Sequence, residues 1–195
     1  NQKNNKENDH NRFLHFHLSF FINRLAGSHG APVVRFLDRL LPRIEEVLEG
    51  VVQELQVKAH EKRLDLIFEK PRNPLPLFRF DKDKIRNVVL NLVDNAIHYT
   101  EKGSVNVNAK VQMPNDKNTM VISVKDTGLG MSKEEIQSLF QSFTRGETGN
   151  RAWAEGSGLG LYIAKQFVAL HKGTISAQSQ GKGQGSTFVV ELPLT

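Results

Sequence analysis

Residues 81–100 read DKDKIRNVVLNLVDNAIHYT, and this stretch decides the fold. Apolar residues recur there at helical spacing, and Asp81 precedes them as a typical N-cap, so we predict a helix over residues 82–99. Its apolar stripe consists of Ile85, Val88, Val89, Leu92 and Ala96. A helix with one apolar face needs a second layer to cover that face.

Outward from this helix, apolar residues alternate with polar ones in several short runs, which indicates strands. We predict strands at 64–68, 105–111, 120–124, 174–177 and 187–192, and a short extended piece at 76–80. Helical spacing or helix-start signals predict further helices at 42–55, from 132 onward and at 159–171. Hairpins whose helices must share one face predict an α+β fold. We expect a two-layer α/β sandwich with a mixed, mostly antiparallel sheet covered on one face by helices.

The composition excludes several classes of protein. The chain has 195 residues, a formal net charge of +5 and no cysteine. The excess of basic residues is scattered, so we predict no nucleic-acid partner. Disulfides and thiolate zinc sites are impossible without cysteine, and no apolar run reaches the roughly 20 residues of a membrane helix. We therefore expect a cytoplasmic location and no membrane contact by this chain.

The first residues differ in character from the rest. Residues 1–11 are polar, 12–25 could form a short helix, and 26–30 read as a linker. We predict an N-terminal segment over 1–31 and one folded domain over 32–195.

Two amide side chains lie near the apolar stripe of the central helix. Asn91 and Asn95 lie one turn apart, and His98 follows on the same side. A carboxamide oxygen is a suitable ligand for Mg²⁺, which prefers hard oxygen ligands and keeps several waters. The alternative is that both amides are exposed or join the helix to a neighbouring strand.

A carboxylate and two glycines follow the predicted strand at 120–124. Asp126 can only accept hydrogen bonds when ionised, so it suits the exocyclic amine of adenine. Gly128 and Gly130 let the backbone approach a flat ring. An ordinary Asp-Thr-Gly turn has the same sequence, so this segment alone is weak evidence.

A third segment, GSGLGL, runs from Gly156 to Leu161 into the last predicted helix. Backbone amides at a helix N-terminus attract phosphate. The segment lacks the Lys-Ser/Thr of a P-loop and the parallel continuation of a dinucleotide-binding fold. Together the three segments supply a metal ligand, a base-reading acid and phosphate-binding amides, so we predict binding of ATP with Mg²⁺.

Residues 141–157 show little apolar periodicity and read as a long loop. We interpret this loop as a mobile lid over the nucleotide, with Arg145 near the terminal phosphate, where a guanidinium stabilises transferring charge. Phe140 and Phe143 flank its start and could equally be core anchors. Trp153 could be a surface tether or a lid contact.

In this order the segments resemble the catalytic ATP-binding domain of bacterial sensor histidine kinases, which shares the Bergerat fold with gyrase, MutL and heat-shock chaperones. Residues 91–100 look like its asparagine box, 125–131 and 155–161 its two glycine boxes, 140–145 its phenylalanine box, and 185–188 its closing strand. The resemblance covers roughly residues 40–194.

The resemblance implies roles for individual residues. Asn95 would ligate Mg²⁺ and act in catalysis with Arg145, and Asp126 would bind the adenine amine. The remaining nucleotide contacts implied are Asn91, His98, Tyr99, Gly128, Gly130, Gly156, Ser157, Gly158, Leu159, Gly160, Leu161 and Thr187. The expected partners are a histidine-bearing dimerisation domain and, through it, a response regulator. The domain could then be the cytoplasmic part of a membrane-attached sensor.

Two features depart from the family pattern. His98 stands where the family usually has lysine, and an unperturbed histidine is mostly uncharged at neutral pH. The family's phosphoacceptor motif, His-Glu/Asp followed by Arg-Thr-Pro, does not occur in the chain. Three functions follow: a kinase for a histidine located outside this chain, a nucleotide-dependent binding module without chemistry, or a MutL-like ATPase. In the last case Asp94 would be the nearest carboxylate to activate water.

Overall fold

A computed structural model describes residues 42–112, 118–140 and 159–194 of the chain. The predicted N-terminal helix, residues 113–117 and the whole predicted lid at 141–157 lie outside these ranges. The proposed domain boundary at residue 31 also lies outside them and stays a prediction.

The described elements follow the order expected from the sequence. They are α3 (Ile44–Glu61), β1 (Leu64–Glu69), α4 (Lys82–Tyr99), β2 (Gly103–Gln112), β3 (Thr119–Asp126), α5 (Lys133–Ser138), α6 (Gly160–Leu170), β4 (Thr174–Gln178) and β5 (Thr187–Pro193). The predicted bounds of α4 are confirmed, and the Asp81 side chain caps the helix by accepting from Lys84 N at 3.0 Å. The predicted capping box at Ser132 and Glu135 is also confirmed.

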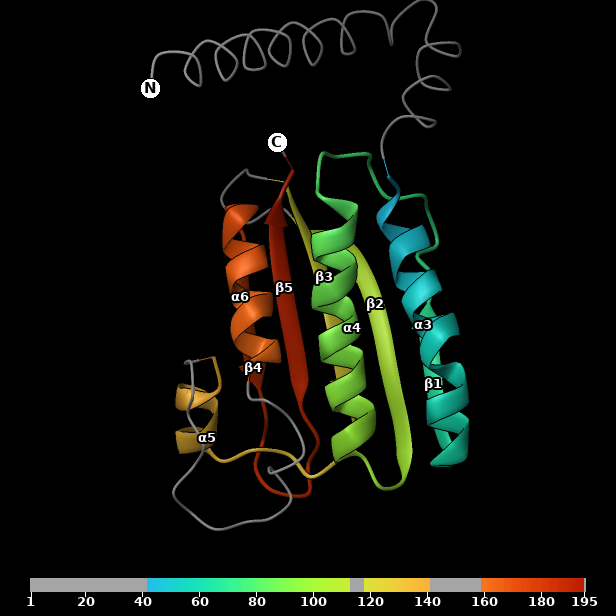
Figure 1. The fold of residues 1–195 in the computed structure, drawn as a ribbon, viewed down its shortest axis with the longest axis vertical. Coiled ribbons are helices and arrows are strands. Elements are labelled where there is room, and N and C mark those ends of the chain that lie inside the picture. Colours follow the sequence, from blue (N-terminus) through green and yellow to red (C-terminus); the bar gives the residue numbers. More distant parts are fainter. Residues whose placement is uncertain (1–41, 113–117, 141–158, 195) are drawn as a thin grey trace, which may run out of the picture. The chain divides into compact units, whose positions relative to one another are not determined.

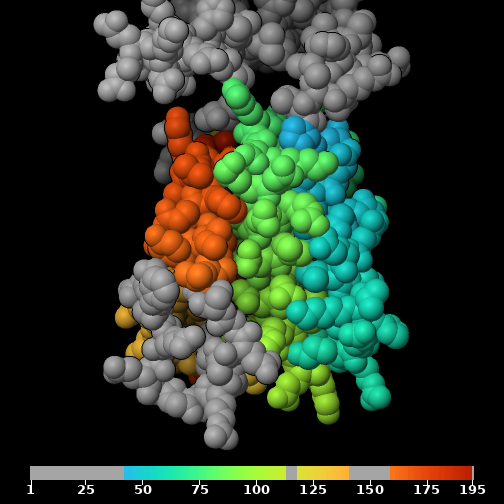
Figure 2. Space-filling view, in the orientation of Figure 1, coloured from blue at the N-terminus to red at the C-terminus, as the bar shows by residue number. Residues whose placement is uncertain are grey.

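The five strands form one sheet in the order β1-β2-β3-β5-β4. Strand β1 is parallel to β2, and every other pair is antiparallel. Helices α3, α4 and α6 lie side by side on one face of the sheet (Figure 1). They form a continuous layer in the space-filling view (Figure 2). The predicted two-layer α+β sandwich with a mixed, mostly antiparallel sheet is therefore confirmed.

The predicted extended piece at 76–80 forms no strand of the sheet. Phe78 and Phe80 are buried there and stack on each other, with ring centroids 4.8 Å apart. Their burial explains the apolar alternation that suggested an extended element.

The core lies between the helices and alternate residues of the central strands. On β2 and β3, Val105, Val107, Met120, Ile122 and Val124 are buried at 0% exposure. The residues between them on β2 and β3 point to the opposite face, because side chains alternate along a strand. Helix α4 supplies the matching apolar side through its predicted stripe, of which every member is buried.

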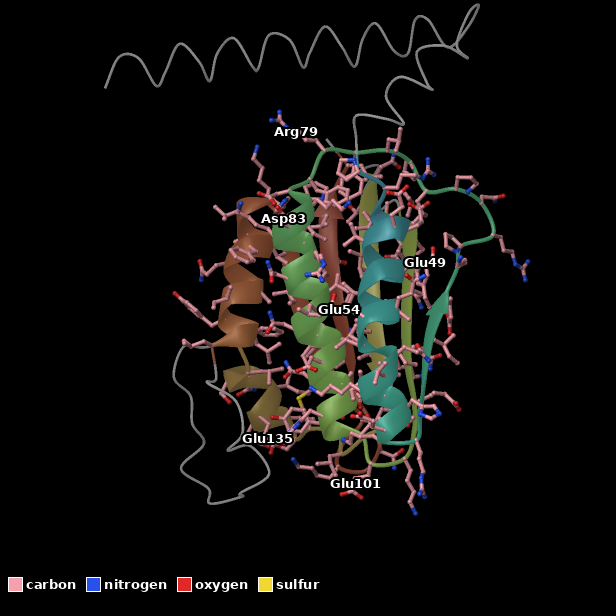
Figure 3. The ribbon with its side chains drawn as sticks, turned by 45° about the vertical axis from the view of Figure 1, so that its right-hand side comes forward. Glu49, Glu54, Arg79, Asp83, Glu101 and Glu135 are labelled. Carbon is pink, nitrogen blue, oxygen red and sulfur yellow. The ribbon has the colours of Figure 1, made fainter. Side chains whose placement is uncertain are left out.

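Ion pairs on the exposed surface connect α3 to α4. Lys58 pairs with Asp94 at 2.5 Å, and Arg86 pairs with Glu54, which is labelled between the two helices in Figure 3. Because these side chains are about 40% exposed or more, each pair contributes at most about 1 kcal/mol. The apolar layer beneath them carries most of the association.

The C-terminal end of α4 has all four of its last carbonyls satisfied, although such groups lack partners within a helix. Thr100 Oγ1 donates to Ala96 O at 2.7 Å, and Lys62 Nζ donates to the carbonyls of Ile97 and His98 at 2.7 and 2.8 Å. Leu129 N donates to Tyr99 O at 3.1 Å. These contacts fix the loop after β3 against the end of α4.

A histidine fixes the opposite ends of α6 and α4 to each other. His171 Nε2 accepts from Asp81 N at 2.9 Å, while Nδ1 lies 2.7 Å from Phe167 O. This pattern requires the proton on Nδ1, so that the neutral ring donates to Phe167 and accepts from Asp81. The α6 axis is thereby set relative to α4, whose other end carries the predicted site.

Candidate functional site

The predicted site residues that the structure describes gather at one end of the domain. The C-terminal half of α4, the segment after β3, the start of α6 and the loop between β4 and β5 meet there (Figure 1). Residues more than 30 positions apart in sequence therefore share one small region. Arg145, Gly156, Ser157 and Gly158 lie outside the described residues, and their predicted roles stay predictions.

Asp126 is the most constrained polar side chain in this region. It ends β3 and is only 4% exposed. Its Oδ1 accepts hydrogen bonds from Gly128 N at 2.8 Å and from Ser186 N at 3.1 Å. Its own backbone N donates to Ser186 O at 2.9 Å. Two backbone segments therefore hold the carboxylate in one orientation.

The second carboxylate oxygen is left for another partner. Asp126 Oδ2 accepts no hydrogen bond within the described part of the chain. Every fully buried side-chain oxygen or nitrogen there has a hydrogen-bond partner. Oδ2 must therefore keep some access to its surroundings. Burial raises the pKa of the Asp126 carboxyl, and the two backbone N–H bonds only partly oppose this.

Gly128 and Gly130 are required by the close approach of other backbone segments. A Cβ at Gly128 would lie 2.3 Å from Tyr99 O, and one at Gly130 would lie 2.1 Å from Gly181 O. Gly130 also has φ +62°, which side chains with a Cβ rarely adopt. The two glycines thus shape the segment beside Asp126, and their predicted approach to a flat ring stays a prediction.

Asn91 and Asn95 lie on the side of α4 that faces α6. Asn91 Nδ2 donates to Asn87 O at 2.9 Å, which leaves Oδ1 directed at the first residue of α6, Gly160. Asn95 is half-buried and makes no hydrogen bond within the described residues, so its amide is available to an outside group.

The Asn95 amide oxygen suits a hard cation that takes few of its ligands from the protein. No group of three or more His, Cys, Asp or Glu side chains in the described ranges could hold a metal. An amide oxygen alone is a weak protein site, but Mg²⁺ is commonly held by one or two protein oxygens together with substrate phosphates and water. Asn95 can play that part only if the ligand brings its own oxygens.

The other predicted contacts take various positions. His98 is exposed and packs edge-to-face on Tyr99, with ring centroids 4.7 Å apart, and burial raises the pKa of the Tyr99 hydroxyl. Leu159 and Leu161 are half-buried at the start of α6. Phe140 packs against the core, which agrees with its interpretation as an anchor.

Thr187 lies on the other face of the sheet from Asp126. It pairs with Lys125, while the next pair, Val124 and Phe188, points into the core. Because faces alternate, Asp126 and Ser186 share the helix-covered face and Thr187 does not. The hydroxyl on the same face as Asp126 is therefore that of Ser186, and the predicted nucleotide contact of Thr187 stays a prediction.

Sequence reasoning missed two side chains that hold the region together. Lys62 satisfies carbonyls at the end of α4, and Ser179 bonds to Met131 N at 3.0 Å. Neither residue carries a local signal, since lysines and serines in turns are ordinary. These bonds join residues 35 or more positions apart, a relationship that only the fold reveals.

Comparison with known proteins agrees with this geometry. The family model described as histidine kinase-, DNA gyrase B- and HSP90-like ATPase matches residues 80–195. Sensor protein RprX of Bacteroides fragilis is 34% identical over 149 residues, covering 76% of this chain and 28% of RprX. Sensor histidine kinase YclK of Bacillus subtilis is 32% identical over 160 residues, covering 82% of this chain and 32% of YclK.

Solved structures give the same result. Full-length ShkA in complex with AMPPNP superposes with a TM-score of 0.68 at 29% identity, covering 80% of this chain and 31% of ShkA. The catalytic domain of histidine kinase ThkA superposes with a TM-score of 0.66 at 26% identity, covering 79% of this chain and 94% of that domain.

The fold and site define an ATP-binding domain of the kinase type, and the chain belongs to the histidine kinase-, DNA gyrase B- and HSP90-like ATPase family. The resemblance to sensor histidine kinase catalytic domains is confirmed by the relatives and by the solved structures. The chain spans about a third or less of the lengths of RprX and YclK. Within the described ranges, no helix is both long enough and apolar enough to cross a bilayer.

Proposed function

We propose that this chain is the catalytic domain of a two-component sensor kinase, which transfers the γ-phosphoryl group of ATP to a protein histidine located outside the chain. The observation that carries the proposal is the buried Asp126, whose Oδ1 is held by two backbone amides while Oδ2 stays accessible. A carboxylate in this state is an acceptor of fixed direction, and the exocyclic amine of adenine is a matching donor.

The proposed adenine site consists of Asp126 with the glycine segment beside it. Gly128 and Gly130 would bring backbone close to the ring. The Ser186 hydroxyl lies on the same face of the sheet as the acid. Guanine carries a carbonyl where adenine carries the amine, so an ionised Asp126 would repel it. The proposed site therefore selects ATP over GTP.

The phosphate side is proposed from α4 and α6. Asn95 would hold Mg²⁺ together with phosphate oxygens, and Asn91 would support it from one turn away. Mg²⁺ neutralises phosphate charge during transfer. We assign phosphate contacts to Gly160 at the start of α6 and to Gly156, Ser157 and Gly158, which precede it in sequence. We assign the terminal phosphate to Arg145.

In the proposed reaction, a histidine nitrogen of the acceptor domain attacks the γ-phosphorus. A P–N bond forms as the bond from the γ-phosphorus to the bridging oxygen breaks, and ADP leaves. Such transfer depends mainly on positioning and on charge stabilisation. This chain would hold the nucleotide, and the acceptor domain would bring the nucleophile and later pass the phosphoryl group to a response regulator. We place the domain in the cytoplasm, where ATP and the regulator are available.

A specific observation favours one alternative. His98 is exposed where the family usually has lysine, so a charged contact to phosphate is weakened, which suits a binding module without chemistry. The ATPase alternative loses support, since Asp94 pairs with Lys58 at 2.5 Å toward α3, away from Asn95.

The deciding experiment supplies a separate histidine-bearing acceptor domain to the chain with γ-labelled ATP and Mg²⁺. The proposal expects label on the acceptor, in an acid-labile and base-stable form typical of phosphohistidine. If both the wild-type chain and its His98→Lys variant bind ATP tightly but transfer no phosphate to an acceptor, the binding-module alternative is established instead.

A further inference from the structure

We propose that Ser179 is a positioning residue for Asp126, and that its hydroxyl sets how well the domain distinguishes adenine from a purine without the exocyclic amine. This inference rests on the proposed function, because it assumes that Asp126 binds adenine. Ser179 lies just after β4 and has no part in the motifs that identify the family.

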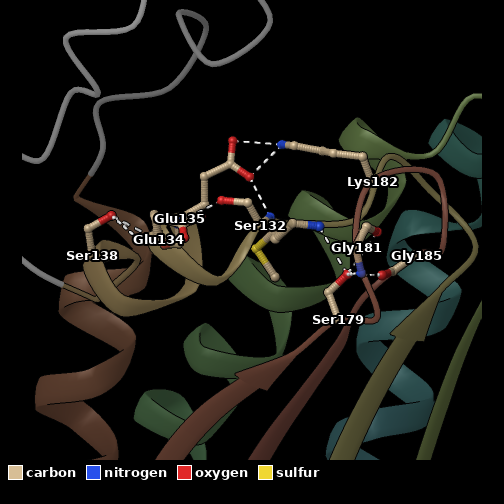
Figure 4. Close-up of polar contacts among 9 residues, drawn as sticks. Ser132, Glu134, Glu135, Ser138, Ser179, Gly181, Lys182 and Gly185 are labelled. Atoms are coloured by element: carbon tan, nitrogen blue, oxygen red, sulfur yellow. Dashed lines mark hydrogen bonds and ion pairs between the residues drawn. The ribbon is translucent and has the colours of Figure 1, made fainter.

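The Ser179 hydroxyl uses its full hydrogen-bonding capacity. Oγ donates to Gly185 O at 2.7 Å and accepts from Met131 N at 3.0 Å and from Gly181 N at 3.2 Å. A hydroxyl has one proton and two lone pairs, so all three are engaged. Figure 4 shows these contacts converging on Ser179.

Through these bonds Ser179 closes the β4–β5 loop and holds it to the segment after β3. The two loop segments run side by side. Gly183 N donates to Leu129 O at 2.7 Å, and Gly185 N donates to Gly128 O at 3.0 Å. The next residue along is Ser186, whose N–H binds Asp126 Oδ1 at 3.1 Å. Ser179 is therefore two contacts away from the adenine-binding carboxylate, through Gly185.

An ion pair strengthens the same connection from the other side. Lys182 Nζ, on the tip of the loop, lies 2.6 Å from Glu135 Oε1, and the Glu135 carboxylate also accepts from Ser132 N at 2.8 Å (Figure 4). Although burial acts to raise it, the pKa of Glu135 is lowered by Lys182 and Ser132. The charged pair is partly exposed, so we expect it to support the loop less than the Ser179 bonds do.

Removing the hydroxyl leaves two backbone N–H groups and one carbonyl without their partner. The loop is then free to shift at Gly185, and the Ser186 N–H with it. Since Ser186 and Gly128 together fix the direction of Oδ2, a shift misaligns the bond to the adenine amine but leaves the phosphate side unchanged. The expected loss is thus specific to the base.

The test compares affinities for ATP and for purine riboside triphosphate, which lacks the amine, by calorimetry with Mg²⁺ on the whole chain. Ser179→Ala is expected to reduce the ratio of the two affinities by about tenfold, as for a misaligned hydrogen bond to a charged group. Ser176→Ala is the matched control, because Ser176 is an exposed β4 residue whose hydroxyl makes no hydrogen bond in the described chain. Its affinity ratio should stay at the wild-type value.

Ser179→Cys keeps the size of the side chain with a much weaker donor, so it carries the test if the alanine variant does not fold. Circular dichroism of each variant confirms the fold. An unchanged affinity ratio in a folded Ser179 variant, including one with both affinities equally reduced, would overturn this inference and leave the proposed function intact. A wild-type chain that binds both nucleotides equally would overturn the adenine assignment itself, and the role of Ser179 with it.

Discussion

The carboxamide oxygen of Asn91 faces the first residue of α6 so closely that a Cβ at Gly160 would lie 2.4 Å from it. Asn91 cannot turn away freely, since its Nδ2 donates to Asn87 O. This contact links the amide pair of α4 to the end of α6 where phosphate is proposed to bind. A small residue at 160 is therefore a condition for the geometry of Asn91.

We expect Gly160→Ala to displace the Asn91 amide and to weaken MgATP binding by about 1–2 kcal/mol, the cost of disturbing one polar contact. Calorimetric titration measures the effect. The matched control is Gly50→Ala in α3, where no atom lies within 4 Å of the added Cβ, so that helix propensity should raise stability by up to about 1 kcal/mol with unchanged binding. Equal binding by both variants would contradict the role of the Asn91–Gly160 contact.

Asp126→Asn should reduce the affinity for ATP by about 1.5–3 kcal/mol, because a charge-assisted hydrogen bond to the amine becomes a neutral one. The same change should raise the free energy of unfolding at neutral pH. It removes a buried charge, and an amide oxygen can still accept from Gly128 N and Ser186 N. Calorimetry and urea unfolding measure the two effects. A variant that is less stable and binds normally would contradict both expectations.

The raised pKa of Asp126 predicts opposite pH trends for binding and stability. Since the folded-state pKa lies above its ordinary value of 3.8, the native chain holds the proton more tightly, and the free energy of unfolding falls as pH rises through this window. ATP affinity should instead decrease as pH falls through the raised pKa, since a protonated carboxyl loses its acceptor character. The Asp126→Asn variant corrects for titration of ATP itself. The same pH dependence of affinity in wild type and variant would count against the prediction.

Asp94→Asn tests the ATPase alternative. Asp94 and Lys58 are both more than 40% exposed, so removal of their pair should change the free energy of unfolding by less than about 1 kcal/mol. Slow ATP hydrolysis by the chain should be unchanged, as measured by phosphate release. If hydrolysis is abolished, Asp94 activates water and the ATPase alternative gains support.

Lys172→Gly should stabilise the fold by about 0.5–1 kcal/mol. Lys172 has φ +57° at the end of α6, where Lys172 N donates to Ala169 O and Gly173 N donates to Val168 O. Glycine takes this left-handed conformation without the steric cost of a Cβ. Lys165→Gly, inside the exposed side of the same helix, is the control and should destabilise by about 1 kcal/mol. Urea unfolding distinguishes the two signs.

The fold was predictable where the sequence periodicity of an element matches the face that it buries in the tertiary structure. The stripe on α4 and the alternation of β2 and β3 predicted both the elements and the face that each buries. The segment at 76–80 was the exception, since its alternating aromatics are buried and stacked on each other but form no strand of the sheet. Alternation reports burial on one side of a chain, and it cannot distinguish a sheet from another buried surface.

The site was predictable to the level of its motifs and less so at the level of single side chains. Asp126 lies beside Gly128 at the end of its predicted strand, whereas Ser186 and Thr187, neighbours in sequence, lie on opposite faces of the sheet. An error of one residue in a strand reverses the face, since the side chains have a period of two. The role of Asn95 stays a prediction, which binding measurements test.

The sequence by itself determined which residues can bind a nucleotide, because amide, carboxylate and glycine are chemical properties of single positions and their order along the chain is read directly. Only the tertiary structure decided which oxygen of Asp126 is occupied, that Ser179 and Lys62 hold the surrounding backbone, and that Asn91 meets Gly160. These are contacts between segments that are distant in sequence. Their geometry is set by how the helices pack on the sheet, and no short stretch of sequence contains that information.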